Sequence, residues 1–185
     1  MEKFDGSADA DEEQDTLKTE IAKVVYPIAV TGTDDFAAVE DISGEQLVAA
    51  SIWEIIINGQ DLSMLTDEET GNIVIPHSQI EYVTSKLFGI EENIEPCDVA
   101  VDGIEIKYDK SSKNYVVPAE HDVYTVYPEV SAVKEQDGIY TVSVDYYSDG
   151  PSWTKDKKTA PDKNVVFTLK KTSDYYNIIS AVTNQ

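Results

Sequence analysis

Two histidines and one cysteine are the side chains of this sequence best suited to acid–base, metal or nucleophilic chemistry. His77 follows Pro76, and His121 stands between Glu120 and Asp122, where a carboxylate could orient the imidazole for proton transfer or metal binding. Neither histidine lies in the spacing of a zinc-protease, hydrolase or structural-metal motif. We therefore expect His77 to be a polar turn residue and keep His121 as a candidate ligand-binding residue.

Cys97 is the only cysteine, so the chain forms no internal disulfide. It follows an acidic segment, residues 91–95, and precedes Asp98. Nearby negative charge raises the pKa of a thiol and disfavours the reactive thiolate. The sequence therefore predicts no nucleophilic cysteine, and we expect no catalytic residue, no metal site and no cofactor.

Aromatic residues are a richer source of candidate binding groups. Tyr146, Tyr147 and Trp153 surround the turn at 148–151, and Tyr140 precedes them in the same predicted strand. Flat aromatic rings beside carboxylates and amides are typical of sugar and peptide recognition, although tyrosines also cover ordinary sheet faces. The candidate ligand-binding residues are Tyr146, Tyr147, Trp153, Tyr140 and His121.

The charge of the chain excludes several classes of partner. Its 185 residues include 36 acidic and 14 basic side chains, for a net charge of −22, and all the basic residues are lysines. Such a polyanion cannot neutralise phosphates, so we expect no nucleic-acid partner. No run approaches the roughly 18 apolar residues of a membrane span. The lysines of loop 148–164 form a local basic cluster that could dock an acidic partner.

Hydrophobic periodicity predicts helices in the first half of the chain. A helical face begins at Leu17, and Pro27 is expected to end it. Ser43 and Gln46 have the spacing of a capping box, which predicts a helix that stops at a left-handed Gly59. A second capping box at Ser78 predicts another helix that ends at Gly89.

The period changes from 3.6 to 2 after Cys97, which indicates strands. A hairpin is predicted from 104 to 117, and further strands at 123–133, 139–147, 165–170 and 176–182, with a tight turn at Asp137-Gly138. The predicted fold is therefore α+β, with N-terminal helices packed on a curved antiparallel sheet built mainly from the C-terminal half. We expect residues 1–16 to be an acidic flexible linker and 17–185 to be a single domain.

Several short motifs resemble those of a known type of protein. The segments 86–89, 108–115, 167–171 and 175–180, behind a polar N-terminal run, resemble extracytoplasmic lipoprotein-type proteins of gut Firmicutes over residues 42–185. The last two segments also resemble the closing strands of cystatin-like and NTF2-like α+β folds. This resemblance implies export, tethering at the cell surface or secretion, with a possible membrane anchor upstream of the chain.

The sequence therefore favours an exported, non-catalytic binding or structural domain at the cell surface, whose partner is an unknown protein, peptide or glycan. One alternative is an NTF2-like pocket for a small molecule, in which His121 and a carboxylate could catalyse a reaction. The other is an interaction module that binds peptide or glycan through the aromatic loop at 146–164.

Overall fold

The chain forms three α-helices and two four-stranded antiparallel sheets in the part that the structure describes. The structure is a computed structural model that describes residues 7–59, 61–91, 93–120, 126–148 and 160–184. The helices are α1 (Ser7–Thr31), α2 (Gly44–Asn58) and α3 (His77–Phe88), with short 3-10 turns η1 (Val39–Asp41) and η2 (Ser63–Leu65). The strands are β1 (Ile73–Pro76), β2 (Val99–Val101), β3 (Ile104–Asp109), β4 (Asn114–Val117), β5 (Tyr127–Gln136), β6 (Ile139–Tyr147), β7 (Lys163–Lys171) and β8 (Tyr176–Thr183).

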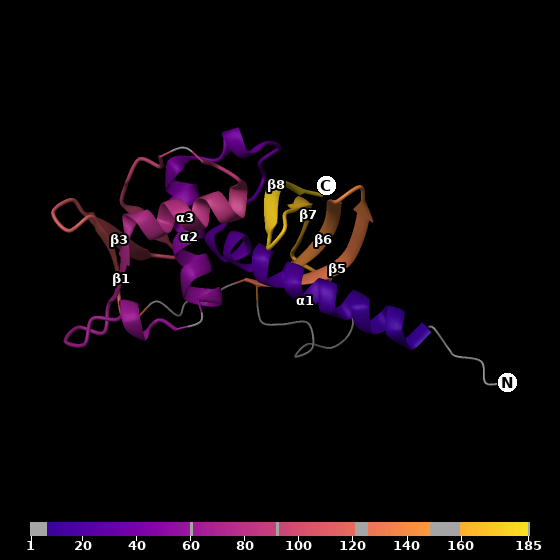
Figure 1. Cartoon of the computed structure of the whole chain (residues 1–185), viewed down its shortest axis with the longest axis horizontal. Helices are drawn as coiled ribbons and strands as arrows, with labels where there is room; N and C mark the ends of the chain where they lie inside the picture. Colours follow the sequence, from indigo (N-terminus) through magenta and orange to yellow (C-terminus); the bar gives the residue numbers. More distant parts are fainter. Residues whose placement is uncertain (1–6, 60, 92, 121–125, 149–159, 185) are drawn as a thin grey trace.

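This arrangement is the α+β fold that the sequence predicts, with the strands divided between two sheets. The smaller sheet has the order β1-β4-β3-β2, and the larger one runs β5-β6-β7-β8. Figure 1 shows the two sheets at opposite ends of the molecule, with α2 and α3 between them and α1 along the larger sheet. One continuous hydrophobic core joins both sheets to the helices.

The predicted alternation along β6 is confirmed. Val142, Val144 and Tyr146 are buried on the face of the sheet that joins the core, and Tyr140 lies half-buried on the same face. From α1, Ile21 and Val25 are fully buried in the same core. The turn before β6 has positive φ at both Asp137 and Gly138, as the predicted hairpin turn requires.

Helix α1 differs from the prediction at both ends. It begins at Ser7, inside the acidic run for which we predicted a linker, and it continues through Pro27 to Thr31. Proline has no N–H, so the carbonyl of Lys23 loses its helical donor. Asn58 of α2 replaces that donor with a hydrogen bond of 2.8 Å from Nδ2 to the Lys23 carbonyl. The expected stop at Pro27 is therefore wrong, because a neighbouring helix satisfies the vacant carbonyl.

The capping predictions for α2 and α3 have mixed outcomes. Ser43 and Gln46 form the predicted capping box, and Gly89 ends α3 in the left-handed conformation with φ of 69°. Gly59, however, ends α2 in an extended conformation with φ of −61°, so the predicted left-handed stop is wrong there. Helix α3 begins at His77, one residue before the predicted Ser78 cap, and Pro76 makes no side-chain cap.

Candidate functional site

The structure separates the tyrosines that the sequence proposed as one binding group. Tyr146 and Tyr147 are neighbours on a strand, so their side chains lie on opposite faces of the larger sheet. Both are buried, and Tyr140 packs edge-on against Tyr176 with ring centroids 5.2 Å apart. The other two candidates, His121 and Trp153, lie outside the described residues. The three described candidates, Tyr140, Tyr146 and Tyr147, therefore do not form a shared aromatic surface.

Tyr146 lies beside a compact charged cluster at one end of the larger sheet. Lys163 Nζ lies 2.9 Å from the carboxylate of Asp34 and 3.2 Å from that of Asp35, and the Thr183 amide donates to Asp35 at 2.7 Å. Burial, followed by these two aspartates, raises the pKa of the Tyr146 phenol. The phenol is therefore neutral, and the cluster attaches the 33–36 segment to the strands β7 and β8.

His77 and Cys97 belong to a second cluster, around the smaller sheet. His77 Nε2 donates to the Ile94 carbonyl at 2.9 Å, which leaves Nδ1 to accept from the Tyr115 hydroxyl at 3.3 Å. The imidazole thereby joins α3, the following loop and β4. Burial raises the pKa of the Cys97 thiol, and the charges of Glu45 and Asp98 raise it further. These features agree with a structural histidine and an unreactive thiol.

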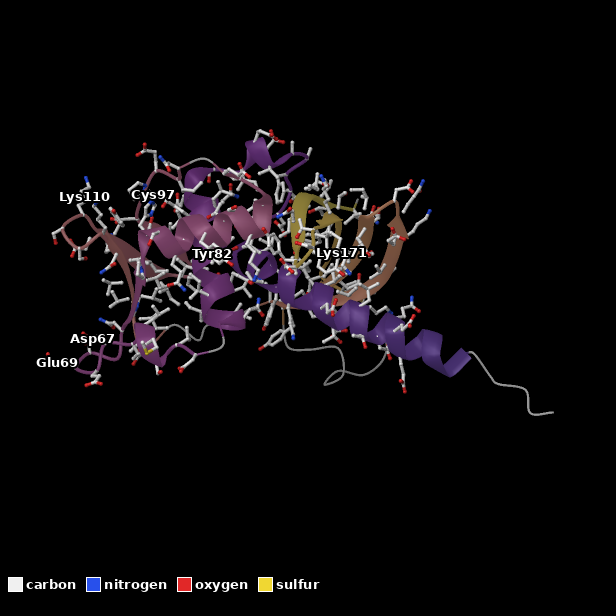
Figure 2. All side chains as sticks on the ribbon, in the orientation of Figure 1. Asp67, Glu69, Tyr82, Cys97, Lys110 and Lys171 are labelled. Carbon is white, nitrogen blue, oxygen red and sulfur yellow. The ribbon has the colours of Figure 1, made fainter. Side chains whose placement is uncertain are left out.

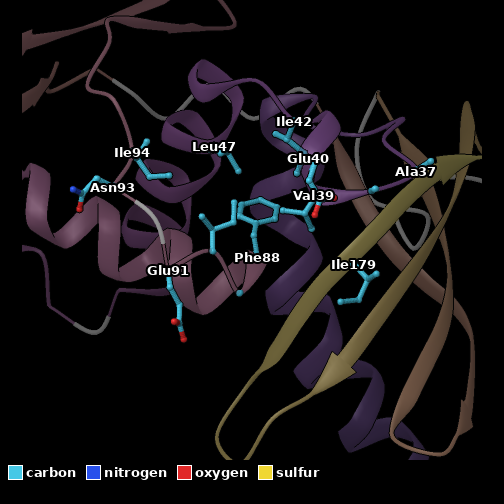
Figure 3. A pocket seen from close by; sticks show the side chains of 13 residues that line it. Ala37, Val39, Glu40, Ile42, Leu47, Phe88, Glu91, Asn93, Ile94 and Ile179 are labelled. Atoms are coloured by element: carbon cyan, nitrogen blue, oxygen red, sulfur yellow. The ribbon is translucent and has the colours of Figure 1, made fainter.

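The strongest candidate site is an apolar pocket of about 870 Å³ between η1, α2, the end of α3 and β8. Figure 3 shows Phe88 at its centre, with Leu47 and Ile42 from the α2 side and Ile179 facing them from β8. Its lining residues are Ala37, Ala38, Val39, Glu40, Ile42, Leu47, Phe88, Gly89, Ile90, Glu91, Asn93, Ile94 and Ile179. Sites for small molecules commonly have this size and an apolar lining with a few polar groups.

The end of α3 positions the floor of the pocket. The Phe88 ring packs edge-on against Phe36, with ring centroids 6.4 Å apart, and both are buried. Gly89 then turns the chain with positive φ, and Asn177 of β8 donates to the carbonyl of Lys86 at 2.8 Å. These contacts fix Phe88 between α3 and the larger sheet.

The walls of the pocket come from a capped helix start and an irregular strand. The capping box fixes the start of α2, where Leu47 lies one residue after Gln46. On the opposite wall, the β7–β8 register steps from Ser180 to Ile178, so Ile179 has no partner in β7. Such a bulge bends the strand and redirects a side chain. Ile179 is 36% exposed, which makes it the accessible apolar wall of the pocket.

The rim of the pocket carries negative charge. Glu40 and Glu91 line the pocket and are exposed, and no lysine is among the lining residues. Neither carboxylate forms an ion pair with a described residue. The arrangement can therefore bury an apolar group while it attracts positive charge at the edge.

Comparisons with protein-family models, curated proteins and solved structures gave no match. Among the described residues, no group of three or more histidine, cysteine, aspartate or glutamate side chains could hold a metal ion. In the same part of the chain, no helix is long and apolar enough to cross a membrane.

A second cavity, of about 510 Å³, has a different chemical character. It lies between α1, α2, α3 and the β7–β8 turn, where Figure 2 shows Lys171. At its edge, Glu54 is only 8% exposed, with Asn58 Nδ2 at 2.5 Å and Lys86 Nζ at 3.5 Å. Burial raises the pKa of the Glu54 carboxyl, while Asn58 and Lys86 counteract that shift. The Glu54 carboxylate therefore has its partners within the protein, which favours a structural role for this residue.

Sequence reasoning missed the apolar pocket for a physical reason. Its apolar residues have the spacing of ordinary core positions on α2 and α3, and nothing in that pattern separates a wall from a filled interior. Glu40 and Glu91, 51 positions apart, approach the same pocket only in the folded chain. The available signal was the pairing of an apolar helix end at Phe88-Gly89 with an acidic segment directly after it.

Proposed function

We propose that the protein is a non-catalytic binding domain that recognises an apolar group in the pocket around Phe88. The observation that carries this proposal is the accessible apolar wall at Ile179, opposite a floor that Phe36 and the α3 end hold in place. Burial of apolar surface in such a pocket supplies about 25 cal/mol for each Å² removed from water. A preformed site loses little of this gain to ordering.

The experiment measures binding of a neutral apolar dye by fluorescence to the wild-type protein and to two serine variants. Ile179→Ser removes the accessible wall, and Val182→Ser is the matched control on the same strand, where Val182 is 45% exposed and does not line the pocket. We expect Ile179→Ser to weaken dye binding several-fold while Val182→Ser leaves it unchanged, with similar melting temperatures. Equal dye affinities for all three proteins would contradict the proposed site.

We also propose that the domain acts outside the cytoplasm, tethered at the cell surface or secreted. The support is the resemblance of residues 42–185 to extracytoplasmic lipoprotein-type proteins. Fractionation of the native host, with protease added to intact cells, tests the location. Recovery of the protein from the cell surface or the medium supports it, whereas a protease-resistant cytoplasmic pool would contradict it.

A further inference from the structure

We propose that the occupant of the Phe88 pocket is a peptide segment that carries a large apolar side chain flanked by basic residues. This inference rests on the proposed function, since it assigns a chemical class to the ligand of the same pocket. It depends on three features of the described residues, which are the apolar floor, the placement of the rim charges and the edge of β8 that borders the pocket.

The floor and walls select a large apolar group. Phe88, Leu47 and Ile42 are each more than nine-tenths buried, so they define a fixed surface. Val39 and Ile90 are half-buried and Ile179 is more exposed, so apolar surface is left for a ligand to cover. A cavity of about 870 Å³ exceeds the volume of one aromatic side chain, and neighbouring residues of a peptide can occupy the remainder.

The rim charges select positive groups on both sides of that anchor. Figure 3 shows Glu40 and Glu91 on opposite sides of Phe88, from η1 and from the loop after α3 respectively. Both carboxylates are exposed and unpaired among the described residues. An arginine can bind each of them with two parallel hydrogen bonds, and this chain has no arginine of its own.

The net charge of −22 disfavours binding of a second copy of the chain or of an anionic ligand in the pocket. A second copy of the chain would bring two polyanions together, and an anionic lipid or phosphate ligand would meet the same repulsion. A basic partner is attracted by the same field, which raises its association rate at low ionic strength.

The larger sheet already pairs an extended segment beside the pocket. Phe36 and Ala181 exchange both backbone hydrogen bonds, at 2.8 and 3.0 Å, on the outer edge of β8. Ile179, two residues before Ala181, lines the pocket at the bulge. The pocket therefore borders an edge of the sheet where one extended segment already pairs with β8, and such an edge suits an extended peptide better than a compact small molecule.

The test uses three short peptides whose binding is measured by fluorescence anisotropy and confirmed by calorimetry. The parent has a central tryptophan with an arginine on each side. In the second peptide both arginines are replaced by glutamate, and in the third the tryptophan is replaced by glycine. We expect the parent to bind about tenfold more tightly than either control peptide, and to weaken when ionic strength rises from roughly 0.05 to roughly 0.5 M.

Charge-matched protein variants assign the effect to the rim. The double variant Glu40→Gln/Glu91→Gln should weaken the parent peptide several-fold without a change in binding of the neutral dye. The control Glu68→Gln/Glu69→Gln removes the same charge from exposed positions on the loop before β1 that do not line the pocket, and it should have little effect. Figure 2 shows Glu69 at the end of the molecule that holds the smaller sheet.

The outcomes distinguish failure of the basic-peptide inference from failure of the proposed binding pocket. If the dye binds in an Ile179-dependent manner and the parent peptide binds no better than its acidic version, the basic-peptide inference is overturned while the pocket stands. If neither dye nor peptide depends on Ile179, both proposals fail. Equal losses in the rim variant and its control would also overturn the inference, because they would reflect net charge alone.

Discussion

Asn58 donates a hydrogen bond of 2.8 Å to the backbone carbonyl of Lys23, the carbonyl that Pro27 leaves without a helical partner. The same side-chain amide lies 2.5 Å from Oε2 of Glu54, whose other oxygen lies 3.5 Å from Lys86. One amide group therefore connects α1 with α2 and, through Glu54, with α3. These three helices build the walls of the charged cavity and support the Phe88 pocket.

Replacement of Asn58 by alanine should destabilise the fold. The buried Glu54 carboxyl and the Lys23 carbonyl would both lose a donor, and leaving the buried carboxyl without that donor costs about 1–3 kcal/mol. Urea unfolding at neutral pH measures the loss in the free energy of unfolding. In a Pro27→Ala background, residue 27 regains the N–H that bonds to Lys23, so Asn58→Ala should cost less there. Identical costs in the two backgrounds would show that the Lys23 contact does not stabilise the protein.

The buried carboxyl of Glu54 should make the protein less stable as pH rises. Burial is the largest cause of its raised pKa, so the folded state holds the proton more tightly than the unfolded chain does. Stability then falls as pH rises from 4.5, the ordinary glutamate value, through the raised folded pKa. Glu54→Gln removes this titration, so its stability relative to wild type should improve across that window. A difference that is constant with pH would contradict the raised pKa.

Sequence patterns predicted the elements whose ends depend on local chemistry. The Ser43 cap, the left-handed Gly89 and the Asp137-Gly138 turn each follow from the preferences of one or two neighbouring residues. The α+β class followed from the change of hydrophobic period. By contrast, the path of α1 through Pro27 depends on Asn58, 31 positions further along the chain.

The candidate site was harder to predict from the sequence than the helix ends, because it depends more on tertiary structure. Tyr146 and Tyr147 looked like one aromatic group in the sequence, yet alternation along β6 places them on opposite faces, and Tyr146 lies beside the charged cluster of Asp34 and Lys163. The Phe88 pocket combines residues from four separate segments. Local spacing can predict which face of an element is apolar, but it cannot predict where two such faces leave a space between them.

A buried hydroxyl pair should stabilise the packing of α2 on α3. Ser51 and Thr84 are fully buried, with their hydroxyl oxygens 2.7 Å apart, and Thr84 donates to the Ile80 carbonyl at 2.9 Å. Ser51 then donates to Thr84. Thr84→Val leaves the Ser51 hydroxyl without an acceptor and should cost about 1–3 kcal/mol. The double variant Ser51→Ala/Thr84→Val removes both polar groups and should cost less than the sum of the single variants. Additive losses in thermal unfolding would contradict a direct interaction.

Lys163 should stabilise the end of the larger sheet through the two aspartates that it joins. Asp34 is largely buried, and Asp35 has a lowered pKa because Thr183 donates to it and, to a smaller extent, because Lys163 lies close. A lowered carboxyl pKa contributes stability that is present above 3.8, the ordinary aspartate value, and is lost as pH falls through the folded pKa. Lys163→Gln leaves two neighbouring carboxylates without their cation and should cost about 1 kcal/mol at neutral pH, a small value because the side chains are partly exposed.

The matched control for this variant is Lys170→Gln, which removes an exposed lysine from the same strand that forms no ion pair with a described residue. Chemical unfolding should show a larger loss for Lys163→Gln than for Lys170→Gln at neutral pH. That difference should shrink as the aspartates take up protons in acid, because the carboxylates then no longer repel each other. Equal losses at neutral pH would mean that the variants report the overall charge of the protein, and that the Asp34–Lys163 contact adds nothing to its stability.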